Sequence, residues 1–130
     1  MDLKDLTPKN DDVLVEIVHP VTREPILKPD GTQMSLTLMN PYSKEYREVM
    51  YERTDVRLEE AQKSGSTKVK AKDADMASID TLARITKDWN IHYDGEEPKL
   101  SINKAKKIYD DLRWMKLQAE EALENQEAFT

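Results

Sequence analysis

Two short stretches near the start of the chain alternate between apolar and other positions, the pattern of half-buried β-strands. The first covers residues 13–18, where one face is fully apolar, and the second covers residues 33–38, where the apolar side chains share one face. Between them, the sequence Pro-Asp-Gly at residues 29–31 supplies a fixed φ and a residue tolerant of positive φ, as a turn requires. We therefore expect an antiparallel hairpin whose second strand exposes its polar face, with Ile26 and Leu27 as candidates for a short third strand.

A long helix is expected directly after the second strand, because two strands alone are marginally stable and need a helix over their apolar face. Asn40 or Ser43 can cap this helix, and Pro41 suits its first turn. Apolar side chains then follow at helical spacing until about Gln62. Residues 63–72 combine Ser, Gly and Lys and break this spacing, so we expect a flexible linker there.

The second half of the chain predicts two further helices. Helical spacing runs from Asp73, a candidate cap, to Asp88 and leads to Trp89. Gly and Pro within residues 94–98 then enforce a loop. Ser101 is the expected cap of a final helix of about 26 residues, about 39 Å long. Because a compact protein of this length has a radius of gyration of about 14 Å, such a helix either kinks or reaches a partner.

These elements predict an α+β fold that is mostly α-helical, with a small antiparallel β-hairpin followed by helices and a long C-terminal helix. Residues 1–12 are expected to form a mobile N-terminus. The hairpin and first helix occupy residues 13–62, the linker residues 63–72, and the helical region residues 73–130. The two larger parts form one domain or two half-domains that pack against each other.

Composition narrows the classes of function. The chain has no cysteine, which excludes disulfides and thiolate catalysis, and no apolar run long enough to cross a membrane. Its start has no signal-peptide pattern, so we expect a protein of a reducing cytoplasm. The formal net charge of −6 opposes binding to nucleic acid. The one dense basic run, at residues 68–72, has the alternating pattern of a solvated linker.

The sequence offers little support for enzyme chemistry. His19 and His92 are the only histidines, and both lie in predicted turns without a positioned nucleophile or orienting group. The acidic loop at residues 94–97 lacks the ligand spacing of an EF-hand, and the three glycines are too far apart to form a phosphate-binding loop. We therefore expect no catalytic residue, no metal site and no cofactor.

Large aromatic side chains are the remaining candidates for function. Trp89 is expected to anchor the core. Trp114 lies beside Met115 and Leu117 on a helix whose main apolar stripe passes through Leu112. Because this position is off the stripe and large aromatics dominate protein interfaces, Trp114 is the preferred exposed anchor for a partner.

Several motifs follow one another in order along residues 13–130. In the first half they are His19-Pro20-x-Thr22-x-x-Pro25, a second strand, and Pro41-x-Ser43-x-x-Tyr46-Arg47. In the second half they are Trp89, a turn with Gly95 and Pro98, Ser101, Asn103-Lys104-Ala105 at a helix start, and Tyr109 before Trp114. This order and the chain length resemble the tail assembly chaperones of long-tailed, non-contractile bacteriophages.

The resemblance implies a non-enzymatic role in the host bacterial cytoplasm. Proteins of this family hold the tape-measure protein, a long helical chain with exposed apolar stripes, until tail-tube subunits polymerise around it. The family commonly makes a longer frameshift product that recruits the tail-tube protein, and self-association along the tape measure is expected. With this role in view, the candidate partner-binding residues are Trp89, Ile91, Tyr109, Trp114 and Leu117.

Two other functions remain open at this point. The chain has the size of a structural connector or minor tail protein that is retained in the virion. A small regulatory DNA-binding protein is the third alternative, although it requires a basic face that the sequence lacks outside residues 63–72.

Overall fold

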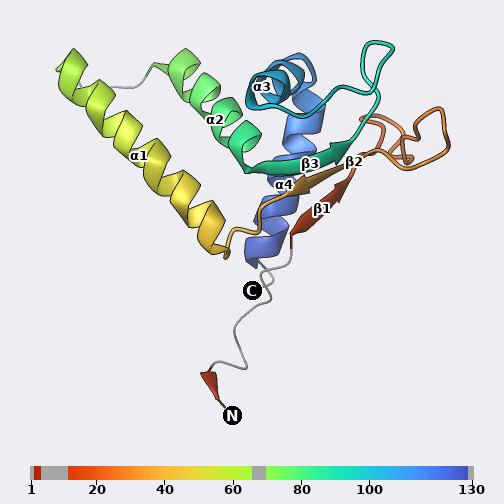
Figure 1. The fold of residues 1–130 in the computed structure, drawn as a ribbon, viewed down its shortest axis with the longest axis horizontal. Helices are drawn as coiled ribbons and strands as arrows, with labels where there is room; N and C mark the ends of the chain where they lie inside the picture. The colour runs from red at the N-terminus through yellow and green to blue at the C-terminus, as the bar shows by residue number, and fades with distance from the viewer. Residues whose placement is uncertain (1, 4–11, 66–69, 129–130) are drawn as a thin grey trace.

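The structure is a computed structural model that describes residues 2–3, 12–65 and 70–128. Within these residues it has three strands and four helices (Figure 1). In chain order they are β1 (Val13–Glu16), β2 (Ser35–Leu38), α1 (Lys44–Ser64), α2 (Ala71–Ile85), β3 (Thr86–Asn90), α3 (Ile102–Asp111) and α4 (Arg113–Ala128). The predicted α+β, mostly helical fold with a long last helix is confirmed.

The three strands form one antiparallel sheet in the order β1-β2-β3. The predicted hairpin is present, with Val15 opposite Leu36, and β2 also pairs with β3, where Leu36 lies opposite Trp89. The prediction that the second helix continues to Asp88 is therefore wrong. The helix ends at Ile85, and the residues that follow form β3, which hydrogen-bonds to the edge of β2 that would otherwise be unpaired. Leu27 makes only an isolated bridge with Gln33, so the third strand is not the one expected.

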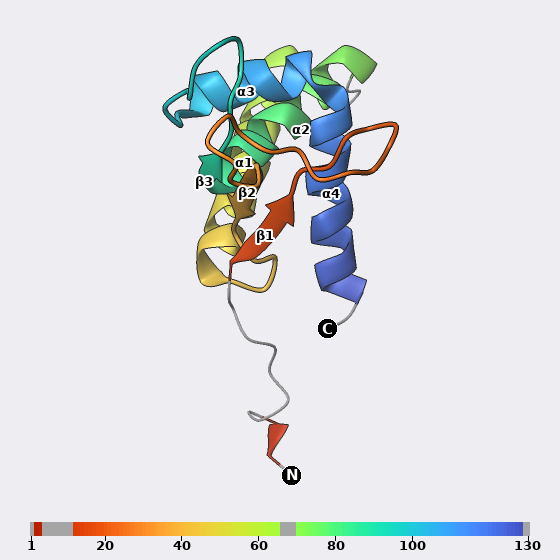
Figure 2. The same ribbon diagram turned by 90° about the vertical axis from the view of Figure 1, so that its right-hand side faces the viewer.

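One core unites the sheet with helices α2, α3 and α4. Leu36, Leu38, Ile108 and Tyr109 are fully buried in it, and Ala119 of α4 is buried as well. Helix α4 runs alongside β1 behind the sheet (Figures 1 and 2). The two regions predicted at residues 13–62 and 73–130 thus contribute to the same core.

The ends of α1 and α2 differ from the predicted linker. Ser43 is the N-cap of α1 and accepts a hydrogen bond from the backbone of Tyr46 at 3.2 Å, while Gly65 ends the helix with a φ of 66°. Helix α2 begins at Ala71 without a side-chain cap, so the expected capping role of Asp73 is wrong, and Asp73 lies in the first turn. The segment between the two helices is shorter than the expected linker. Residues 66–69 of that linker lie outside the described residues. Most of the expected mobile N-terminus also lies outside them.

The final helix kinks, which was one of the two outcomes expected for its length. The break falls at Leu112, whose φ of −114° and ψ of 72° are not helical. Beyond it, Arg113 donates to the carboxylates of Asp75 and Asp110, both at 2.6 Å. The break lets α3 cross α2 while α4 follows the sheet (Figure 2).

Candidate functional site

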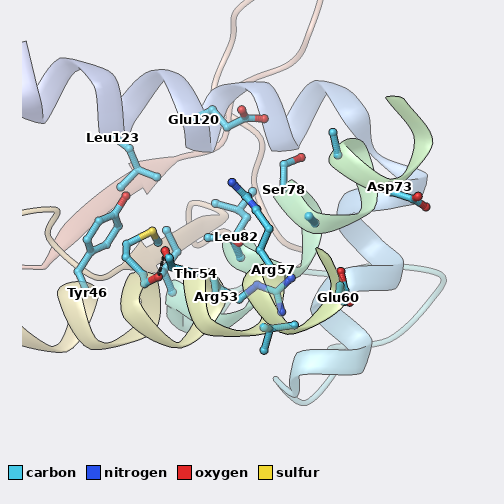
Figure 3. Close-up of a pocket in the computed structure, with 16 residues that line it drawn as sticks. Tyr46, Arg53, Thr54, Arg57, Glu60, Asp73, Ser78, Leu82, Glu120 and Leu123 are labelled. Carbon is cyan, nitrogen blue, oxygen red and sulfur yellow. Dashed lines mark hydrogen bonds between the residues drawn. The ribbon is translucent and has the colours of Figure 1, made fainter. Parts of the chain in front are cut away.

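Helix α1 diverges from α2 (Figure 1). Between them lies a groove of about 590 Å³ that α4 closes on its far side (Figure 3). The two helices are close at the end where α1 begins and α2 ends, and they separate toward the other end (Figure 1). We call the close end the apex and the open end the mouth. The groove is therefore a wedge bounded by three helices.

The floor of the groove is one face of α2. Apart from Asp73 at one end, its exposed or half-buried members are small, and they recur at helical spacing as Ala74, Ala77, Ser78 and Thr81. Toward the apex, buried Leu82 and Ile85 continue the same face into the core. Small side chains allow the backbone of another helix to approach closely, which large side chains at these positions would prevent.

The walls of the groove are apolar near the apex. Tyr46 projects from α1, and Leu123 projects from α4 toward Tyr46 (Figure 3). Met50 of α1 also lines the groove. All three are partly buried and pack against the core. Part of the apolar surface of these three side chains faces the groove, where no described segment covers it.

The walls become charged toward the mouth. Arg53 and Arg57 follow Met50 along α1, and Glu60 on α1 and Asp73 on α2 lie at the open end (Figure 3). On the α4 side, Glu120 lines the groove and pairs with Lys116 at 2.6 Å, so its charge is already compensated.

A buried carboxylate fixes α1 to the rest of the fold. Asp80 of α2 is only 8% exposed, and it lies 2.9 Å from Arg53, 2.8 Å from Arg84 and 3.4 Å from Lys106, so it joins α1, α2 and α3. Burial raises the pKa of Asp80, but the hydrogen bond from Arg84 and the charges of Arg53 and Arg84 outweigh it and lower the pKa overall. This cluster holds the wall of the groove in place.

The side chains of α1 that pack against the core come from its first half. Tyr46, Val49 and Met50 pack against the core, and Glu45 lies 3.0 Å from Lys87 of β3. Farther along, Leu58 is 58% exposed. The second half of α1 therefore extends from the body as one side of the groove (Figure 1).

No family model, curated protein or solved structure matches this chain.

Two of the five predicted partner-binding residues are core residues. Tyr109 is fully buried, and its hydroxyl lies 2.8 Å from that of Thr86. Ile91 is 5% exposed and follows β3. Tyr109 therefore has no exposed surface in this structure, and Ile91 has very little.

The other three lie at or near the surface but apart from the groove. Trp89 is half-buried, and its Nε1 donates to the carbonyl oxygen of Pro98 at 2.8 Å. Trp114 is also half-buried, and with Ile91 it lines a second, smaller pocket of about 160 Å³. Leu117 is 58% exposed on α4. The structure thus brings Trp114 and Ile91 together but does not assemble the five residues into one site.

The sequence carries a signal for the groove, namely the small residues that recur between positions 74 and 81 of a predicted helix. The charged residues of the mouth, Arg57, Glu60 and Asp73, gave no separate signal, because charges on an exposed helix usually mark only a solvated face. Their arrangement depends on the angle between two helices, which a sequence pattern does not contain.

Other candidate chemistry has structural partners. His19 Nδ1 accepts from the backbone of Val21 at 3.1 Å and Thr22 at 3.2 Å, which stabilises its turn. Among the described residues there is no group of three or more His, Asp or Glu side chains placed to hold a metal ion. In the same part of the chain, no helix combines the length and apolar character needed to cross a bilayer.

Proposed function

We propose that this chain is a phage tail assembly chaperone that binds amphipathic helical segments of a tape-measure protein and catalyses no reaction. The observation that supports this most directly is the groove between α1, α2 and α4, with its floor of small residues and its apolar apex. Amphipathic helices commonly bind in such grooves, where their apolar face replaces water against the walls.

The groove is suited to many related segments instead of one sequence. Met50 is unbranched and adapts to different partners, and the wall formed by the second half of α1 has few contacts that would fix it. A tape-measure protein repeats its apolar stripes along a great length, so many copies binding weakly in parallel would cover it. The acidic surface, with a net charge of −6, disfavours contact with nucleic acid.

The proposal includes the partners and place that the motif order implies. The tape-measure protein is the main partner, self-association occurs along it, and a longer frameshift product recruits tail-tube subunits. These steps take place in the host bacterial cytoplasm before the tail is complete.

Co-expression with the neighbouring long tape-measure-like gene product tests this function. We expect a soluble complex that contains several copies of this chain per long chain, measured by size exclusion with light scattering. An insoluble long protein, with this chain eluting alone, would contradict the chaperone role. Stoichiometric presence of the chain in purified virions would instead favour a structural connector.

A substitution in the floor tests whether the groove is the binding site. Ala77→Trp fills the groove and should prevent retention of the long protein, while the variant keeps its helical circular dichroism. Met76→Trp is the matched control, because Met76 is the neighbouring residue on α2, is 44% exposed and does not line the groove. Equal retention by both variants would place the binding site elsewhere.

A further inference from the structure

The charged residues of the groove have a definite order from apex to mouth. Along α1, Met50, Arg53, Arg57 and Glu60 follow at intervals of three or four residues, so they share one face and lie about one turn, or 5.4 Å, apart. Asp73 of α2 adds a second carboxylate at the mouth (Figure 3). The lining thus changes from apolar to basic to acidic.

Three of these charges have no partner within the described structure. Arg53 is paired with Asp80 at 2.9 Å. Arg57, Glu60 and Asp73, by contrast, form no ion pair or side-chain hydrogen bond with any described residue. They line a groove that would partly exclude water once occupied, and desolvating an uncompensated charge is unfavourable. An occupant that supplies opposite charges at these positions is therefore favoured.

We infer that the groove selects partner helices by the order of their charges, a conclusion that rests on the proposed helix-binding function. The fitting helix carries a basic residue opposite Glu60 and Asp73, an acidic residue one turn farther along opposite Arg57, and apolar residues three and four turns from the first, opposite Met50 and Tyr46. In sequence this is a basic residue at i, an acidic residue at i+4, and apolar residues at i+11 and i+14, or the same order reversed. A helix with the acidic and basic residues exchanged would place like charges together at both positions.

Two synthetic helical peptides of identical composition test the inference. The first carries Lys at i, Glu at i+4, and Leu at i+11 and i+14, and the second has the Lys and Glu exchanged. Their binding to the full chain is measured by fluorescence anisotropy at low ionic strength, where exposed ion pairs are least screened. We expect the first peptide to bind about five-fold more tightly, since each exposed pair contributes modestly and each like-charge contact opposes binding.

Charge reversal in the groove provides the decisive comparison. Arg57→Glu should abolish or invert the preference between the two peptides. Arg47→Glu is the matched control, because Arg47 is an exposed residue of the same helix that does not line the groove, and it should leave the preference unchanged. Both positions are exposed on α1, and neither makes an ion pair with a described residue, so both variants should fold.

The outcomes separate this inference from the proposed function. Equal binding of both peptides, blocked by Ala77→Trp, would overturn charge selection and leave the groove as a helix-binding site. Binding of neither peptide, while the long partner is still retained in the co-expressed complex, would also overturn the inference but not the chaperone role. If Arg57→Glu changed only the oligomeric mass of the free chain, the groove would serve contacts between copies, and the inference would be wrong.

Discussion

The side-chain amide of Gln118 forms both hydrogen bonds of a β-strand partner with the backbone of Val18. Its Nε2 donates to the carbonyl oxygen of Val18 at 2.8 Å, and its Oε1 accepts from the N–H of Val18 at 3.0 Å. Val18 follows β1, which is an edge strand of the sheet. The amide therefore attaches α4 to the sheet and helps to position the α4 side of the groove.

Removing the two hydrogen bonds between Gln118 and Val18 should destabilise the fold. We expect Gln118→Ala to lower the free energy of unfolding by about 1–2 kcal/mol, because two partly buried backbone groups lose their partner. Urea denaturation measures the change. Glu121→Ala, at an exposed site on the same helix, is the control and should differ little from the parent chain. A loss no larger than that of the control would show that water replaces the amide.

The carboxylate of Asp80 should make the stability of the fold depend on pH in the acid range. Its folded-state pKa is lowered from the ordinary value of 3.8, so the folded state binds fewer protons there than the unfolded chain. The contribution of Asp80 is thus complete above pH 3.8 and is lost as the pH falls through the lower, folded-state value. Asp80→Asn should be less stable at neutral pH by about 1–3 kcal/mol, because three cations lose their partner.

Thermal denaturation of the parent chain and Asp80→Asn across the acid range checks this dependence. The two curves should converge as the pH falls, since protonation removes the charge that the variant already lacks. A gap that stays constant down to acid unfolding would mean that the shape of Asp80, and not its charge, holds α1 against α2 and α3.

The phenol of Tyr109 should give the opposite dependence at alkaline pH. Burial raises its pKa from 10.0 to about 12, although the hydrogen bond with Thr86 acts to lower it. Because the folded-state pKa lies above the unfolded value, the stability due to the neutral phenol is complete below pH 10 and is lost as the pH rises through about 12. Absorbance of the tyrosinate ion should show two of the five tyrosines ionising late, because the hydrogen bond with Asp111 raises the pKa of Tyr93 as well, and the ionisation of buried Tyr109 should accompany unfolding.

Tyr109→Phe isolates the contribution of the hydroxyl. The Thr86 hydroxyl keeps its bond to the carbonyl oxygen of Leu82 at 2.8 Å, so the expected cost is only about 1 kcal/mol at neutral pH. The late ionisation that accompanies unfolding should disappear from the titration, while that of Tyr93 should remain. If the ionisation that accompanies unfolding persisted in this variant, another tyrosine would be responsible for it.

The sequence predicted the elements whose signal is local. The strands β1 and β2 alternate regularly, and α1 has a cap and helical spacing from Ser43 onward. Strand β3 was missed because Thr86–Asn90 is polar apart from one tryptophan, and the apolar spacing of α2 runs into it without a break. Its conformation depends on pairing with β2, which lies far away in sequence.

The kink and the groove depend on tertiary packing in the same way. No glycine or proline marks Leu112, so the sequence indicated that the helix was too long for a compact fold but not where it would break. The groove requires α1 to diverge from α2, and this arrangement follows from the contacts of Asp80 with three helices. Local patterns specified the helices but not the angle between them.

Trp114 and Leu117 separate a packing role from a binding role on α4. Trp114 is half-buried against the core, so Trp114→Ala should lower the free energy of unfolding by about 1–3 kcal/mol, less than the loss at a fully buried site. Leu117→Ala should change it by less than about 0.5 kcal/mol, since Leu117 is 58% exposed. Denaturation and retention of the co-expressed long protein are measured on the same preparations, well below the melting temperature of each. Loss of retention by Trp114→Ala at unchanged stability would make Trp114 a surface anchor, because a core residue cannot be truncated without weakening the fold.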